Sequence, residues 1–187
     1  MLVLASASPR RQKLLCNAGI AFEVQPANIP EEPLHGEAPE QFARRLARGK
    51  ALAVSRVRPA DDVLGSDTIV VVGDETLGKP VHASDAIRML QKLSGRTHRV
   101  ITAVCLTRAN RYEDTRSETT EVVMGNISAE EIQAYVASGE PMDKAGAYAI
   151  QGMASRWISR IDGCYFNVVG LPVSLVWRML REHEVGS

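Results

Sequence analysis

The sequence predicts an α/β protein with a mixed β-sheet. Predicted strands and helices alternate along the 187 residues, which favours parallel strands joined by helical crossovers. Other neighbouring strands are separated only by short polar connections, the pattern of antiparallel hairpins. Apolar residues make up 45% of the chain and charged residues 24%, so there is enough apolar material for a sizeable core. We expect a single domain over residues 1–187.

Hydrophobic spacing and capping residues define the elements of the N-terminal half. In the first helix, Ser8 is the expected N-cap, Pro9 occupies the first helical position and Gly19 follows the end. A long polar loop that contains prolines precedes the second helix, and such loops are often functional. The expected elements are a strand at 1–5, a helix at 9–19, an extended segment at 21–25, a helix at 39–57, and strands at 62–72 and 76–81.

The C-terminal half is predicted to alternate in the same way. Ser84 is the expected start of one helix, and Ser128 with Glu131 forms a capping box at the start of the next, which Gly139 ends. The polar segment TRANRYEDTR is expected to connect two strands. The expected elements are a helix at 84–93, strands at 98–107 and 117–125, a helix at 129–138, strands near 156–161 and 164–169, and a last helix from Pro172 to about Glu184.

The composition excludes several classes of protein. Lys and Arg together number 22, as do Asp and Glu, so the chain lacks the basic excess of a duplex nucleic-acid binder. No apolar run approaches the ~18 residues of a membrane helix, and the N-terminal segment lacks the features of a signal peptide. The cysteines Cys16, Cys105 and Cys164 are widely spaced, which favours a reducing compartment. We therefore expect a soluble cytoplasmic protein that binds neither nucleic acid polymers nor membranes.

The stretch SASPRR, residues 6–11, predicts an anion site at the start of the first helix. The first backbone N–H groups of a helix have no internal partner, and the hydroxyls of Ser6 and Ser8 add donors beside them. Arg10 and Arg11 oppose the helix dipole unless an anion neutralises them, and guanidinium forks match phosphate oxygens. An ordinary capped helix with two solvated arginines explains the same pattern equally well.

Asp67 is the second candidate, because it lies inside the apolar strand VLGSDTIVVV. A buried carboxylate needs a metal, a cation or exposure at a cleft. If Gly73 and Asp74 form a two-residue turn, Thr68 falls opposite Lys79 and the lysine lies beside Asp67. Such a pair suits phosphate chemistry, since the carboxylate binds a divalent ion or takes a proton from water. A structural ion pair across a hairpin is the alternative.

Other candidates carry less information by themselves. Lys50 lies on the predicted long helix, where a lysine is usually a solvated charge. Glu31 and Glu32 lie in the proline-containing loop and could ligate a metal, although acidic loop residues are common. The glycines around Gln151 in DKAGAYAIQG indicate close backbone packing or the edge of a ligand site.

Seven short motifs, in order and with similar spacing, resemble those of the Maf family of nucleotide pyrophosphatases. They are SASPRR, RLARGKA, GSDTIVV, LGKP, LSGRTH, DKAGAYAIQG and NVVGLP, and the resemblance runs from residue 2 to about residue 180. The resemblance implies an elongated mixed-sheet fold with two lobes around a cleft, similar to that of inosine triphosphate pyrophosphatases. It also implies a homodimer.

The reaction implied by this resemblance is hydrolysis of a nucleoside triphosphate to the monophosphate and pyrophosphate, assisted by a divalent metal cation, Mg or Mn. Asp67 matches the proton acceptor of the family, and Glu31 together with Asp67 matches its metal ligands. The positions that handle phosphate correspond to Ser6, Arg11, Lys50 and Lys79.

Substrate choice within the family is associated with positions that correspond to Arg10, Thr68 and Gln151, and all three match the branch that acts on dTTP and UTP. A glutamine amide both donates and accepts, as pyrimidine N3–H and O4 require. The resemblance implies dTTP and UTP hydrolysis, with family links to clearing modified nucleotides and to arrest of cell division. Two alternatives stay open: a 7-methyl-GTP pyrophosphatase, and a nucleotide-binding septation regulator without catalysis.

Overall fold

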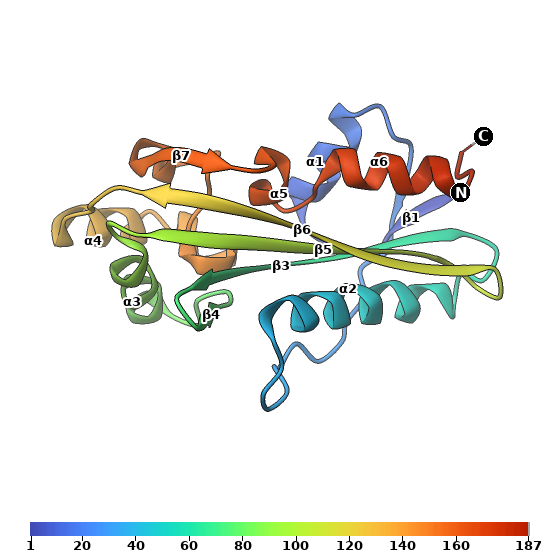
Figure 1. Ribbon diagram of the computed structural model, residues 1–187, viewed down its shortest axis with the longest axis horizontal. Coiled ribbons are helices and arrows are strands. Elements are labelled where there is room, and N and C mark those ends of the chain that lie inside the picture. Colours follow the sequence, from blue (N-terminus) through green and yellow to red (C-terminus); the bar gives the residue numbers. More distant parts are fainter. Residues whose placement is uncertain (187) are drawn as a thin grey trace. The chain divides into compact units, whose positions relative to one another are not determined.

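A computed structural model describes residues 1–186 and has the mixed α/β fold that the sequence predicts (Figure 1). The strands are β1 (Leu2–Leu4), β2 (Glu23–Val24), β3 (Asp62–Val72), β4 (Glu75–Leu77), β5 (Thr97–Arg108), β6 (Tyr112–Met124) and β7 (Ile158–Asp162). The α-helices are α1 (Pro9–Asn17), α2 (Pro39–Ser55), α3 (Ala83–Leu93), α4 (Ala129–Ala137), α5 (Tyr165–Val169) and α6 (Val173–Glu182). Short 3₁₀ helices are η1 (Glu140–Asp143), η2 (Ala145–Ala147) and η3 (Met153–Trp157).

The sheet combines parallel and antiparallel pairs. Within residues 1–186 it has seven strands in the order β2-β1-β3-β5-β6-β7, and β4 pairs with β3. β1 runs parallel to both β2 and β3, whereas β4 is antiparallel to β3 and β7 is antiparallel to β6. Every helix in the described part of the chain is too short or too polar to cross a membrane.

The chain divides into two compact units, which we describe separately. Unit 1 comprises residues 1–68, 102–118 and the segment from Gly170 onward, and unit 2 comprises 69–101 and 119–169. β3, β5 and β6 contribute residues to both units. Within unit 1, α2 lies on one face of the sheet, and α1 and α6 lie on the other (Figure 1).

A close approach between α2 and β3 shapes unit 1. A Cβ atom placed on Gly65 of β3 would lie 2.2 Å from the backbone oxygen of Ala47 and 2.7 Å from the backbone nitrogen of Ala51. Only a residue without a side chain fits in this space. The contact brings Lys50, which precedes Ala51 on α2, against the part of β3 that carries Asp67.

Unit 2 has its own apolar core, to which α3, α4 and the unit 2 segments of the sheet contribute. The predicted capping box at α4 is confirmed: the Glu131 N–H donates to Ser128 Oγ, and the Ser128 N–H donates to the Glu131 carboxylate. Tyr135 of α4 is fully buried, and its ring meets that of Trp157 edge-on at a centroid distance of 5.2 Å.

Some predicted boundaries are wrong. The polar segment between the two long strands is itself mostly strand, because β6 begins at Tyr112 and not near residue 117. Its polar side chains are accommodated by ion pairs, such as those of Glu113 with Arg48 and of Arg116 with Glu182. A strand can therefore be polar wherever neighbouring elements supply opposite charges.

The predicted strand at 164–169 is instead helix α5. A short apolar run fits either structure, and here the buried Asn167 amide donates to Val100 O and Thr120 Oγ1, both at 2.9 Å. α3 begins at Ala83 with His82 as its N-cap and not at Ser84, because the ring nitrogen of His82 accepts the N–H of Asp85.

Candidate active site

Asp67 and Lys50 form a buried ion pair in unit 1. Lys50 Nζ donates to Asp67 Oδ1 at 2.7 Å, and the two residues are only 8% and 7% exposed. Lys50 therefore differs from the usual helical lysine, whose charge is solvated. The lysine that contacts Asp67 comes from α2 and not from the adjacent hairpin, because Gly65 lets the helix approach so closely.

Glu31 joins this pair from the proline-containing loop. Its Oε1 lies 2.6 Å from Lys50 Nζ, and its side chain is about half exposed. One ammonium thus bridges two carboxylates from segments that are far apart in sequence. Two carboxylates that converge in this way fit a small divalent cation, since Mg²⁺ commonly takes one or two protein carboxylates plus phosphate oxygens. Within residues 1–186, no group of three or more His, Cys, Asp or Glu ligands is present.

Lys79 belongs to unit 2. The predicted turn at Gly73 and Asp74 is confirmed, because Val72 pairs with Glu75. The same register, extended, would place Thr68 opposite Lys79, but β4 ends at Leu77. Lys79 is exposed and follows Gly78, whose carbonyl accepts the Gly146 N–H at 3.0 Å.

Arg11 is held by the protein itself. Within the described chain, its guanidinium donates four hydrogen bonds: to Gly170 O at 2.8 Å, Ser66 O at 2.9 Å, Thr68 Oγ1 at 3.0 Å and Ser6 Oγ at 3.1 Å. These acceptors come from the β1–α1 turn, from β3 and from the segment before α6. Arg11 therefore organises the surroundings of Asp67, in addition to supplying positive charge.

Electrostatics around Arg11 follow from this placement. Burial lowers the pKa of the Arg11 guanidinium, and the carboxylate of Asp67 opposes this shift. The neighbouring charge of Arg10, which is half-buried in the first turn of α1, lowers the same pKa further. A negatively charged ligand near α1 would relieve this repulsion.

Ser6 and Thr68 are oriented by the same network. Ser6 Oγ accepts the backbone N–H of Ser8 at 3.3 Å as well as an Arg11 N–H, so one of the first amides before α1 is satisfied within the protein. Thr68 Oγ1 lies 2.9 Å from Thr102 Oγ1, a hydroxyl on β5 that sequence reasoning missed. Thr102 lies 34 residues from Thr68 in the sequence, so no local sequence pattern could have identified this contact.

Gln151 lies in unit 2, in the turn between η2 and η3, and is exposed. The turn is closed by the Gly152 N–H, which donates to Ala149 O at 3.0 Å. Gln151 therefore occupies the third position of a four-residue turn, from which its side chain reaches outward.

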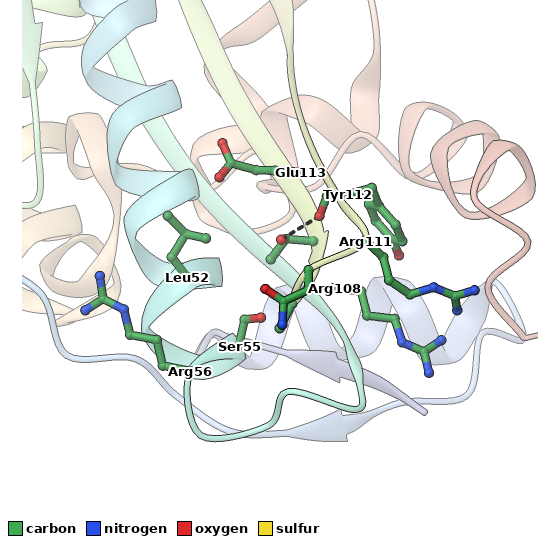
Figure 2. A pocket seen from close by; sticks show the side chains of 10 residues that line it. Leu52, Ser55, Arg56, Arg108, Arg111, Tyr112 and Glu113 are labelled. Carbon is green, nitrogen blue, oxygen red and sulfur yellow. Dashed lines mark hydrogen bonds between the residues drawn. The ribbon is translucent and has the colours of Figure 1, made fainter.

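A separate pocket of about 410 Å³ lies in unit 1, and Figure 2 shows its side chains. Thr107 Oγ1 donates to the backbone carbonyl of Tyr112 at 2.9 Å beside it. No residue that the sequence predicts as a site residue lines this pocket. Its lining residues are Leu52, Ser55, Arg56, Thr107, Arg108, Ala109, Asn110, Arg111, Tyr112 and Glu113.

Comparisons of the sequence with known proteins agree on one family, and a solved structure shares the fold. A family model described as Maf-like protein matches residues 1–183. A Koribacter versatilis protein named dTTP/UTP pyrophosphatase is 56% identical over 184 residues, covering 98% of this chain and 95% of that protein. A Geobacter sulfurreducens protein of the same name is 53% identical over 183 residues, covering 96% and 95%. The solved structure of the Staphylococcus aureus Ham1 protein has a TM-score of 0.52 at 13% identity, covering 97% of this chain and 98% of that one, so it shares the fold.

Proposed function

The chain belongs to the Maf family, and from this premise we propose that it hydrolyses dTTP and UTP to the nucleoside monophosphate and pyrophosphate. The observation that carries the proposal is the buried Asp67, whose carboxylate is held by Lys50 close to Glu31. Relatives that are more than half identical over nearly the whole chain bear the name dTTP/UTP pyrophosphatase, which supports the same reaction and substrates.

Asp67 acts as the proton acceptor in this proposal. A water molecule attacks the α-phosphorus, its proton passes to the Asp67 carboxylate, and the bond from the α-phosphorus to the bridging oxygen of the β-phosphate breaks. The hydrogen bond from Lys50 holds Oδ1, so we assign proton acceptance to the second carboxylate oxygen. Departing pyrophosphate carries negative charge, which Arg11 and the N-terminus of α1 stabilise, together with Lys79 by the family resemblance.

Phosphate binding is assigned to Ser6, Arg11, Lys50 and Lys79. Arg11 contributes charge and holds Ser6 in place, which its hydrogen bonds support, whereas the role of Lys79 rests on the family resemblance. A divalent cation, Mg²⁺ or Mn²⁺, would be held by Asp67 and Glu31 and would neutralise phosphate oxygens.

Pyrophosphate release from a panel of triphosphates tests the proposed function. With Mg²⁺ or Mn²⁺ present, we expect dTTP and UTP to give the highest kcat/KM among dTTP, UTP, CTP, GTP, ATP and 7-methyl-GTP. Chelation of the cation is expected to abolish release. A preference for 7-methyl-GTP would assign the chain to the other branch, and no release from any triphosphate would favour a binding protein.

Base selection is assigned to Arg10, Thr68 and Gln151. We expect Gln151→Glu to lower kcat/KM for UTP by at least about tenfold, because a carboxylate repels uracil O4 where the amide donates to it. The same kinetic panel measures the effect. Gln133→Glu, at an exposed position of α4, is the matched control. An unchanged substrate ranking in Gln151→Glu would contradict the assignment.

The cellular compartment and the oligomeric state of the protein are also proposals. Cys16, Cys105 and Cys164 are free in the described structure, which supports the reducing environment of the cytoplasm. A homodimer is proposed from the family resemblance, and light scattering on the purified protein tests it by its mass.

A further inference from the structure

The turn that carries Gln151 is tied at both ends to two side chains of unit 2. On one side, the Ala149 N–H donates to the hydroxyl oxygen of Tyr135 at 3.2 Å. On the other, the Met153 N–H donates to the Glu140 carboxylate, at 3.1 Å from Oε1 and 3.3 Å from Oε2. The ties lie two residues before and two residues after Gln151.

The two side chains act as one connected unit. The Tyr135 hydroxyl donates its proton to Glu140 Oε1 at 2.8 Å while its oxygen accepts the Ala149 N–H. A continuous path therefore runs from Ala149 through Tyr135 and Glu140 to Met153. We call Tyr135 and Glu140 the brace. Hydrogen bonds that share atoms in this way strengthen one another.

Both parts of the brace are themselves fixed. The ring of Tyr135 is fully buried and packs edge-on against Trp157. Burial and the adjacent carboxylate raise the pKa of the Tyr135 hydroxyl, so the hydroxyl remains a donor at neutral pH. Glu140 begins η1 directly after Gly139, whose positive φ of 78° ends the preceding α4 segment.

Gly152 shows how closely the brace meets the turn. A Cβ atom at Gly152 would lie 2.0 Å from Oε1 of Glu140 and 2.5 Å from its carboxyl carbon. The carboxylate therefore occupies the space where a side chain at this position would begin. Because Gly152 has no side chain, the Glu140 carboxylate can lie directly against the backbone next to Gln151.

We propose that Tyr135 and Glu140 are positioning residues for base selection, which hold the Gln151 carboxamide where it serves uracil or thymine in preference to cytosine. The inference rests on the role of Gln151 in the proposed function. Uracil offers O4 as an acceptor and N3–H as a donor, whereas cytosine offers N4–H₂ and N3 in the opposite sense. An amide that moves and rotates serves either base, so discrimination needs a fixed turn.

The test compares UTP with CTP in variants of the brace. We expect Glu140→Ala and Tyr135→Phe each to lower the ratio of kcat/KM for UTP to that for CTP by about tenfold. Glu140→Gln keeps a carbonyl oxygen for Tyr135 and is expected to restore most of the ratio. Glu130→Ala, which removes an exposed carboxylate from the first turn of α4, is the matched control and should leave the ratio unchanged.

A double variant separates a specific effect from general loosening. In a Gln151→Ala background, Glu140→Ala is expected to leave the UTP-to-CTP ratio unchanged, because the group that the brace positions is absent. If Glu140→Ala lowers the ratio equally in both backgrounds, the brace does not act through Gln151 and the proposal is overturned.

Amide hydrogen exchange tests the brace independently of turnover. Exchange at Ala149 and Met153 is expected to rise by about tenfold or more in Glu140→Ala, relative to wild type and to Glu130→Ala. Unchanged exchange in both brace variants, or faster exchange with an unaltered ratio, overturns the proposal. Wild-type protein that releases no pyrophosphate from UTP would instead reject the proposed function, while the exchange data would still report whether the turn is braced.

Discussion

Asp67→Asn is expected to lower kcat for UTP by about 10²- to 10⁴-fold while the protein stays folded. An amide cannot accept the proton of the attacking water, although it has nearly the same size as the carboxylate. Its oxygen still accepts the hydrogen bond from Lys50, and the lysine keeps Glu31 as a counter-ion at 2.6 Å. The buried ammonium therefore remains compensated, and we expect thermal unfolding to shift little.

Asp62→Asn is the matched control for this experiment. Asp62 also lies in β3, is 6% exposed and accepts a hydrogen bond from the Tyr112 hydroxyl at 2.7 Å, which an asparagine retains. We expect its turnover to remain near that of wild type. Steady-state pyrophosphate release measures both variants, and circular dichroism checks that they fold. Turnover of Asp67→Asn within a few-fold of wild type would remove Asp67 from the role of proton acceptor.

Gly65→Ala is expected to destabilise the protein by about 1–3 kcal/mol and to reduce activity with it. The new methyl group would overlap backbone atoms of Ala47 and Ala51, which are not free to rotate away as a side chain would. α2 must then move outward from β3, and Lys50 moves with it away from Asp67. Denaturant unfolding measures the loss of stability, and the nucleotide assay measures the loss of turnover.

Gly78→Ala controls for the general effect of replacing a glycine. Among residues 1–186, no heavy atom outside its chain neighbours lies within 4 Å of a Cβ built at Gly78. Its unfolding free energy is expected to stay within about 0.5 kcal/mol of wild type. Equal stability of Gly65→Ala and wild type would show that α2 adjusts without cost, contrary to the packing argument.

Local patterns predicted the parts of the fold that local chemistry determines. The bounds of β3, the two-residue turn at Gly73 and Asp74, and the capping box of Ser128 with Glu131 all follow from residues that are neighbours in the sequence. The sequence predicted a strand at α5, because so short an apolar segment does not distinguish the helical from the strand periodicity. The hydrogen bonds of Asn167 to distant residues distinguish the two structures.

The candidate site was harder to predict because its contacts join distant segments. Asp67 was identified from the conflict between a carboxylate and an apolar strand. A buried carboxylate requires a partner, but the strand pattern does not identify it. The hairpin register favoured Lys79, whereas the structure shows that Lys50 contacts Asp67. The close approach of α2 to β3 depends on the absence of a side chain at Gly65, which the structure shows. The catalytic role of Asp67 itself stays a prediction until the asparagine variant is measured.

The hydrogen bond from Arg11 to Gly170 has a consequence for folding during synthesis of the chain. The two residues are separated by 159 positions, so Arg11 leaves the ribosome long before its carbonyl partner. Until then, the guanidinium lacks one of the acceptors that hold it beside Ser66 and Thr68. A nascent chain that stops before Gly170 cannot complete this corner of unit 1. Synthesis through Gly170 is therefore a precondition for the complete set of hydrogen bonds that holds Arg11.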